Sequence, residues 1–252
     1  MGIIINEREF AEAAIVHSDL GEHPTETLSC VAKLYKQQGY KRAEVQEKLE
    51  RFLIACDPQA NIVKWQETLQ RIVRLAFKYP MVEICEIPIT QLEMDLCKSL
   101  RGVQRQRLMF TLICLARLAN LVNNTNGNWV NRGDKEIFKL ANVRVSQVRQ
   151  SLMLNDLMTE GLIGFSKKVD NINIRVDCLD PGGAPKYKIS DLRNLGFQYM
   201  KLAGHNYMEC QSCGIVIPRR TNNQKYCPDC GAEENRQKTR KYWNDVQKVY
   251  RL

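Results

Sequence analysis

Four cysteines near the C-terminus constrain the fold of this chain more than any other feature. They form two Cys-x-x-Cys pairs, Cys210 with Cys213 and Cys227 with Cys230, and thirteen residues separate the inner cysteines. Zinc takes four soft or borderline ligands at tetrahedral corners, and two thiolates from each tight turn can reach one ion. A glycine follows the second cysteine of each pair and permits the left-handed backbone that such a turn needs. We therefore expect one zinc ion bound by these four residues.

The interval between the two pairs is long enough for a short hairpin, and the whole arrangement resembles a four-cysteine zinc ribbon. Four thiolates leave no open position for water, so we expect a structural zinc whose binding supplies folding energy to a small segment. An iron–sulfur cluster and a redox-active cysteine pair are the alternatives. His205 precedes Cys210 by five residues, and we expect it at the surface rather than on the metal.

The other six cysteines stand singly inside apolar stretches. Such cysteines usually behave as small buried hydrophobes, and reduced thiols are typical of a cytoplasmic protein. No apolar run reaches the roughly 18 residues that a membrane span needs, and the N-terminus lacks the features of a signal peptide. We therefore expect a cytoplasmic protein with no membrane partner. The six residues are Cys30, Cys56, Cys85, Cys97, Cys114 and Cys178.

The positive charge of the chain is concentrated in two blocks. The formal net charge is +9, but residues 1–100 carry −3, residues 101–150 carry +7, residues 151–200 are neutral and residues 201–252 carry +5. Such asymmetry indicates a polyanionic partner. The alternative is a solvated basic surface without a ligand.

The first hundred residues predict a helical domain. Apolar residues recur at helical spacing over residues 24–38, 45–56 and 62–79, and glycine or proline signals separate these stretches. Thr90 and Glu93 have the spacing of a capping box at the start of another helix. No catalytic spacing is present. We expect a helical bundle that contacts a protein or positions other parts of the chain.

Residues 105–178 predict a specific order of elements. An apolar helix comes first, then a short and a longer helix around a tight turn, and finally two strands. In the longer helix, we expect Val148, Leu152 and Leu157 to face inward. The expected ranges are 108–122, 134–141 and 145–160 for the helices, and 162–166 and 172–178 for the strands.

This order resembles the winged helix-turn-helix family, most clearly in the run LMTEGLI at residues 157–163. The resemblance implies a mainly α fold with a small β wing. In that family, the second helix of the pair enters the DNA major groove by its N-terminal turns, and the wing can reach the backbone. Winged helices also serve as protein-docking modules, which is the alternative. The implied contact residues are Arg144, Ser146, Gln147, Arg149 and Gln150 in the helix, and Lys167 and Lys168 at the wing tip.

Further basic residues lie in the expected hairpin loop and in a C-terminal helix. Basic side chains beside aromatic ones can bind phosphates and stack on bases. For Tyr242 and Trp243, however, we favour the alternative that they pack the helix on the body. The predicted contact residues are Arg219, Arg220, Arg236, Lys238, Arg240 and Lys241.

We expect four segments: a helical N-terminal domain over residues 1–100, a winged helix-turn-helix over 101–180, a linker with a short helix over 181–206, and a zinc ribbon with a basic helix over 207–252. The leading hypothesis is a non-enzymatic nucleic-acid-binding protein, preferring DNA to RNA, that regulates transcription or replication. The combination resembles small proteins of bacteria, phages and mobile elements.

A second hypothesis is an adaptor or inhibitor from a phage or mobile element. Its acidic N-terminal domain would bind a host protein machine such as RNA polymerase or a CRISPR effector complex. An enzyme is the weakest hypothesis. The chain has only three histidines, and it has no phosphate-binding glycine loop, nucleophile elbow or paired-carboxylate motif.

Overall fold

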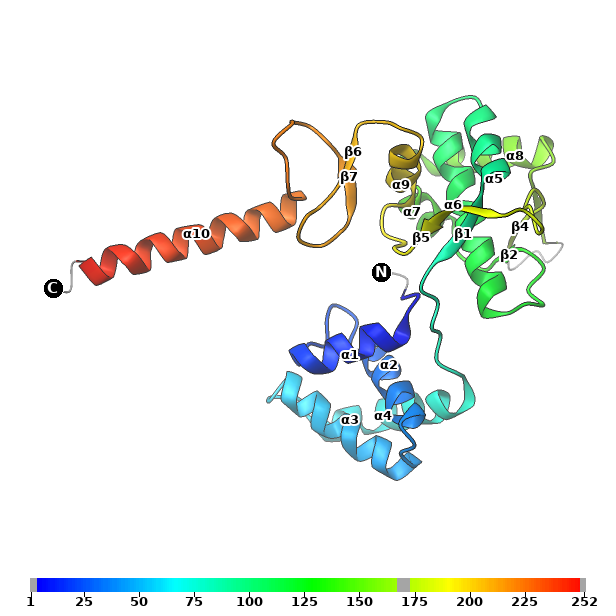
Figure 1. Ribbon diagram of the computed structural model, residues 1–252. Coiled ribbons are helices and arrows are strands. Elements are labelled where there is room, and N and C mark those ends of the chain that lie inside the picture. Colours follow the sequence, from blue (N-terminus) through cyan, green and yellow to red (C-terminus); the bar gives the residue numbers. More distant parts are fainter. Residues whose placement is uncertain (1–3, 167–172, 250–252) are drawn as a thin grey trace. The chain divides into compact units, whose positions relative to one another are not determined.

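The computed structural model describes residues 4–166 and 173–249 of the chain (Figure 1). The chain is mainly helical with small antiparallel sheets, so the prediction of a mainly α protein is confirmed. The chain divides into two compact units, Met1–Glu86 and Ile87–Leu252. No helix in the described ranges combines the length and the apolar composition of a transmembrane span.

The first unit is built from helices with recognisable starts. The side chain of Asn6 accepts a hydrogen bond from the backbone N–H of Glu9, Asn61 caps its helix in the same way, and Pro24 opens another. Buried apolar side chains from all of these helices form one core. The helices are α1 (Glu7–His17), α2 (Pro24–Gln37), α3 (Arg42–Cys56) and α4 (Ile62–Lys78).

Helix α6 (Val103–Val122) is the centre of the second unit. Every residue from Leu108 to Ala116 is buried, and helices and strands pack on several sides of it. The first two elements around it are β1 (Ile87–Thr90) and α5 (Gln91–Ser99). Because both pack on α6, the division between the compact units lies before the boundary that we expected at residue 100.

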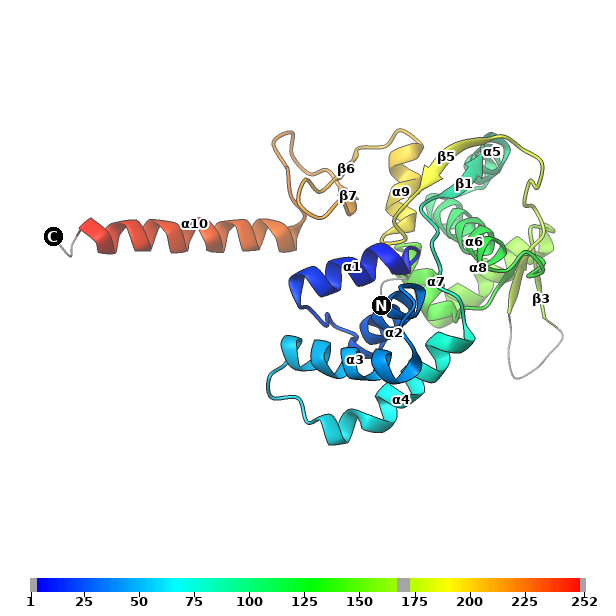
Figure 2. The ribbon, with the colours of Figure 1, turned by 60° about the horizontal axis from the view of Figure 1, so that its bottom comes forward.

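A three-stranded antiparallel sheet accompanies α6 and the two helices that follow it (Figure 2). The strand order is β2–β4–β3, and Arg175 in the central strand lies opposite Trp129 on one side and Gly164 on the other. Strand β2 was not predicted because two residues are too few to show an alternating pattern. The elements are β2 (Trp129–Val130), α7 (Asp134–Leu140), α8 (Gln147–Thr159), β3 (Ile163–Phe165) and β4 (Ile174–Val176).

Helix α8 presents a different side to the core than we expected. Leu157 is buried as predicted, but Val148 is 72% exposed and Leu152 is 49% exposed. Met153 and Leu154 are buried instead. Met153, Leu154 and Leu157 share the buried face of α8, and Val148 and Leu152 lie on the opposite face. The predicted inward orientation of Val148 and Leu152 is wrong.

The segment over residues 181–206 is more than a linker. Strand β5 (Pro185–Ile189) pairs antiparallel with β1, and Ile87 lies opposite Ile189. Pro185 is the first residue of its strand, a position where proline is tolerated because no ladder hydrogen bond is lost. The expected short helix is present as α9 (Leu195–Leu202), and it packs on α6.

A buried carboxylate joins the start of α5 to α6 and to the chain near β5. Glu93 forms the predicted capping box with Thr90. Its side chain also accepts hydrogen bonds from the guanidinium of Arg117, at 2.7 and 2.9 Å, and from the backbone N–H of Asp180 at 3.3 Å. Arg117 in turn donates to the backbone carbonyl of Asp180. These contacts satisfy a charge that has no exposed surface.

Candidate metal centre and nucleic-acid interface

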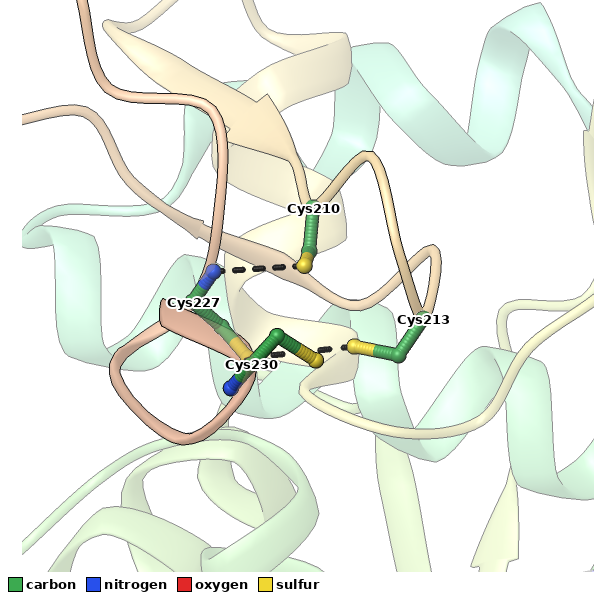
Figure 3. A group of neighbouring side chains, drawn as sticks. All are labelled: Cys210, Cys213, Cys227 and Cys230. Carbon is green, nitrogen blue, oxygen red and sulfur yellow. Dashed lines mark hydrogen bonds between the residues drawn. The ribbon is translucent and has the colours of Figure 1, made fainter. Parts of the chain in front are cut away.

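The four paired cysteines lie together beside a short hairpin (Figure 3). Cys210 directly follows β6 (Tyr207–Glu209), which pairs antiparallel with β7 (Val216–Pro218). Cys227 directly precedes α10 (Pro228–Val249), and Cys230 lies in its first turn. All four sulfur atoms lie within 4.8 Å of one another, so the group can bind a metal ion.

Backbone groups support this arrangement of sulfur atoms. The backbone N–H of Cys227 donates to Sγ of Cys210 at 3.2 Å, and the N–H of Cys230 donates to Sγ of Cys227 at 3.4 Å. Gly214 has the left-handed φ of 74° that we expected after the first pair. Gly231 is part of α10 instead, because the second pair turns into a helix rather than into a strand.

The hydrogen bonds around Cys210 also change its acidity. Burial raises the pKa of its thiol, but donation from the backbone amides of Cys213, Cys227 and Ser212 outweighs burial and lowers that pKa to about 6. Burial raises the pKa of the Cys213 thiol. A metal ion competes with protons for thiolates, so the lowered pKa of the Cys210 thiol favours its binding to a metal.

The six single cysteines have a different environment. Cys30, Cys97 and Cys114 are buried, as we expected, and burial raises the pKa of each of their thiols, for Cys30 to about 12. Cys56 and Cys178 are partly buried, but Cys85 is exposed, so it is not the buried hydrophobe that we expected. None of the ten cysteines, all of which lie in the described part of the chain, forms a disulfide bond.

Helix α9 connects the cysteine hairpin to the turn between α7 and α8. The guanidinium of Arg193 donates to the backbone carbonyl of Cys213 at 2.7 Å, and the side-chain amide of Asn194 donates to the carbonyl of Val216 at 3.1 Å. On the other side, Asn142 in the α7–α8 turn donates to the side-chain oxygen of Asn194 at 2.9 Å. The sequence offered no signal for these long-range contacts, which the structure alone reveals.

Close packing of the backbone strengthens the same connection. A Cβ atom built on Gly196 in α9 would lie 1.8 Å from the carbonyl oxygen of Ala141 in the α7–α8 turn. Glycine is therefore required there for α9 to approach the turn. The rings of Phe197 and Tyr207 lie 5.3 Å apart and join α9 to β6 as well.

The predicted contact residues of α8 gather around its N-terminus. Ser146 is the N-cap of the helix, and its side chain accepts from the N–H of Arg149. Arg144, Gln147 and Arg149 are exposed, whereas Gln150 is partly buried and donates to the carbonyl of Val145. Lys167 and Lys168 lie outside the described residues.

The predicted contact residues of the C-terminal segment are exposed, but they are dispersed along it. Arg219 and Arg220 follow β7, and the other four lie on α10. Arg236 pairs with Glu233 at 2.8 Å and Lys238 pairs with Glu234 at 3.3 Å, which reduces the charge that these two offer. The other two residues on α10 are Arg240 and Lys241.

The aromatic residues of α10 differ from our expectation. Tyr242 is 63% exposed and Trp243 is 57% exposed, and their rings contact each other at 5.7 Å. The favoured interpretation, in which these two side chains pack the helix on the body, is therefore wrong.

A basic cavity that we did not predict from the sequence lies beside α8. It lies between α7 and the start of α8 and has a volume of about 370 Å³. Lys135, Lys139 and Arg144 supply its charged lining. Lys135 and Lys139 are four residues apart, the spacing of one helix face, which could have indicated this cluster.

Comparison with known proteins adds no family assignment: no family model matches this chain, and no curated protein and no solved structure matches it.

Proposed function

We propose that this chain is a non-enzymatic nucleic-acid-binding protein that contacts duplex DNA through a winged helix-turn-helix. The order α6, β2, α7, α8, β3 and β4, with β4 between β2 and β3, carries this proposal. In that architecture α8 is the helix that enters the major groove. The exposed side chains of Gln147 and Arg149 suit the task, because glutamine can pair with adenine and arginine can donate twice to guanine, and the exposed Arg144 can bind a backbone phosphate.

The cysteine cluster is proposed to hold one structural zinc ion in a ribbon. Zinc–thiolate bonds of about 2.3 Å at tetrahedral angles place sulfur atoms about 3.8 Å apart. Sγ of Cys213 and Sγ of Cys227 are separated by 3.8 Å. Four sulfur ligands complete the coordination shell, so the ion would stabilise the hairpin and the start of α10 and leave no position for a catalytic water.

The connection through α9 supports a role for both modules in one binding event. Asn142, Asn194 and Val216 form a continuous path from the α7–α8 turn to β7. The zinc module would thereby support the turn that precedes α8, while its own exposed Arg219 and Arg220 add phosphate contacts.

The test is fluorescence anisotropy of the zinc-loaded chain with labelled duplex DNA, single-stranded DNA and RNA across a range of salt concentrations. We expect duplex DNA to bind most tightly, with affinity that falls steeply as salt rises. Exchanging both Arg144 and Arg149 for Gln should weaken binding and reduce the log–log salt slope by about one, because Arg144 is the proposed phosphate contact and Arg149 the proposed base contact.

The matched control is the exchange of Arg71 and Arg74 for Gln. Both residues are exposed on α4 in the first unit, so this variant loses the same charge far from α8 in the sequence. Its affinity and its salt slope should stay close to those of the unchanged chain. If no nucleic acid binds even at low salt, the proposal fails and the adaptor hypothesis takes its place.

A further inference from the structure

Three apolar side chains on α8 are exposed, namely Val148, Leu152 and Met158, and the first two lie close together in its first half. Val148 is 72% exposed and Leu152 is 49% exposed. Met153, Leu154 and Leu157 form the buried side of this helix. Val148 and Leu152 are four residues apart, so they lie on one face in successive turns. Singly exposed apolar residues are common on protein surfaces, but this pair is adjacent on the helix that carries the proposed DNA contacts.

Basic groups lie near the start of the same helix. Arg149 is exposed next to Val148, and the cavity lined by Lys135, Lys139 and Arg144 meets α8 at Gln150, on the other face of the helix from Val148 and Leu152. None of the described residues that line this cavity is acidic. The first half of α8, from Gln147 to its middle, also has no acidic residue. The exposed face of α8 therefore combines an apolar pair with Arg149, and a cationic cavity lies at the N-terminal end of the same helix.

The major groove of DNA has the complementary pattern. Phosphates border it, and the C5-methyl group of thymine is the apolar group on its floor. Residues four apart on a helix are separated by about 6 Å along its axis, close to two base-pair steps of about 3.4 Å. Two side chains on one helix face can thus reach two methyl groups along the groove.

We propose that Val148 and Leu152 recognise thymine methyl groups in duplex DNA, while the cavity formed by Lys135, Lys139 and Arg144 receives a backbone phosphate. This inference rests on the proposed DNA binding and adds its base specificity. It also gives a chemical basis for preferring DNA to RNA, because uracil lacks the methyl group.

The experiment begins with selection of bound duplexes from a random-sequence DNA pool. The enriched duplex is then resynthesised with deoxyuridine in place of thymine, which removes the methyl groups and leaves the hydrogen-bonding groups unchanged. We expect about four-fold weaker binding for each contacted methyl group. The double variant V148A/L152A should bind the thymine and uracil duplexes with equal affinity.

Leu92→Ala is the matched control, because Leu92 is an exposed apolar residue on α5, 67% accessible, outside the proposed surface. This variant should still distinguish thymine from uracil. Val148 and Leu152 are exposed, so V148A/L152A should keep the unfolding midpoint of the unchanged chain, which confirms that the variant is folded.

Two results would overturn the inference and leave DNA binding in place: equal affinity of the unchanged chain for both duplexes, or binding without enrichment of any sequence. Thymine preference that persists in V148A/L152A would also overturn it, since other residues would then read the methyl groups. Absence of binding to every nucleic acid at low salt would instead refute the proposed function together with this inference.

Discussion

The side-chain amide of Asn142 donates to the side-chain oxygen of Asn194 at 2.9 Å, and both residues have left-handed backbones with φ of 55° and 53°. Asn142 also accepts from the backbone N–H of Phe197. Asparagine suits both positions because it tolerates this conformation better than most residues and offers a donor and an acceptor. The pair joins the turn before α8 to the segment that supports the cysteine hairpin.

Replacing Asn142 separates its backbone role from its side-chain role. Asn142→Gly loses the hydrogen bonds but keeps the left-handed conformation at low cost, whereas Asn142→Ala loses both. We expect Asn142→Ala to be less stable than Asn142→Gly by about 1 kcal/mol in urea unfolding. Equal stability of the two variants would mean that the backbone conformation contributes nothing at this position.

Gly196→Ala should destabilise the second unit. In a helix, alanine is normally better than glycine by about 0.5–1 kcal/mol, but here its Cβ would lie 1.8 Å from the carbonyl oxygen of Ala141. The backbone must move, at a typical overpacking cost of about 1–3 kcal/mol, so the clash outweighs the helix propensity. Thermal unfolding measures the effect, with Gly182→Ala as the control, because nothing lies within 4 Å of a Cβ there.

Arg117→Met should be among the most damaging substitutions. It leaves the carboxylate of Glu93 without its charged partner, and that side chain has no exposed surface. Removing one partner of a buried ion pair costs about 3–5 kcal/mol. In Arg132→Met, by contrast, the lost pair with Glu136 is a partly exposed i,i+4 contact whose loss costs about 0.3–0.5 kcal/mol. Similar losses in chemical denaturation of both variants would contradict this account.

Cys227→Ser should abolish zinc binding and loosen the hairpin and the start of α10, while α5 to α9 remain folded. We would measure bound metal by mass spectrometry and the protection of β6 and β7 by hydrogen exchange. Cys85→Ser is the control, because Cys85 is exposed and lies outside the cluster. A chain that keeps one zinc ion after Cys227→Ser would refute the four-cysteine site.

Local patterns in the sequence predict the structural elements that depend on residues close together in the chain. Helical spacing located α2, α3, α4, α6, α7 and α8, and the Thr90–Glu93 capping box starts α5 as expected. The cysteine spacing located the cysteine cluster because two turns and a hairpin are enough to bring its members together.

Local patterns could not predict the contacts between segments that are distant in the sequence. The pairing of Ile87 with Ile189 and the hydrogen bond between Asn142 and Asn194 join residues that no local pattern relates. The orientation of α8 was also missed. At 3.6 residues per turn, Val148 and Leu152 lie on the opposite face from Leu157, so these three residues cannot share an inward face. Met153, Leu154 and Leu157 do share one, and they form the buried side of the helix.

The pairing of β1 with β5 has a consequence for synthesis on the ribosome. All of the first unit precedes Ile87, so it can fold early. Strand β1 cannot pair, however, until the ribosome has synthesised the chain as far as Ile189 in β5. At about 5–20 residues per second, that wait lasts roughly 5–20 s. During this time β1 is an unpaired strand that other chains can join. A nascent chain that stalls within this interval is thus half folded, with an aggregation-prone strand directly after its finished unit.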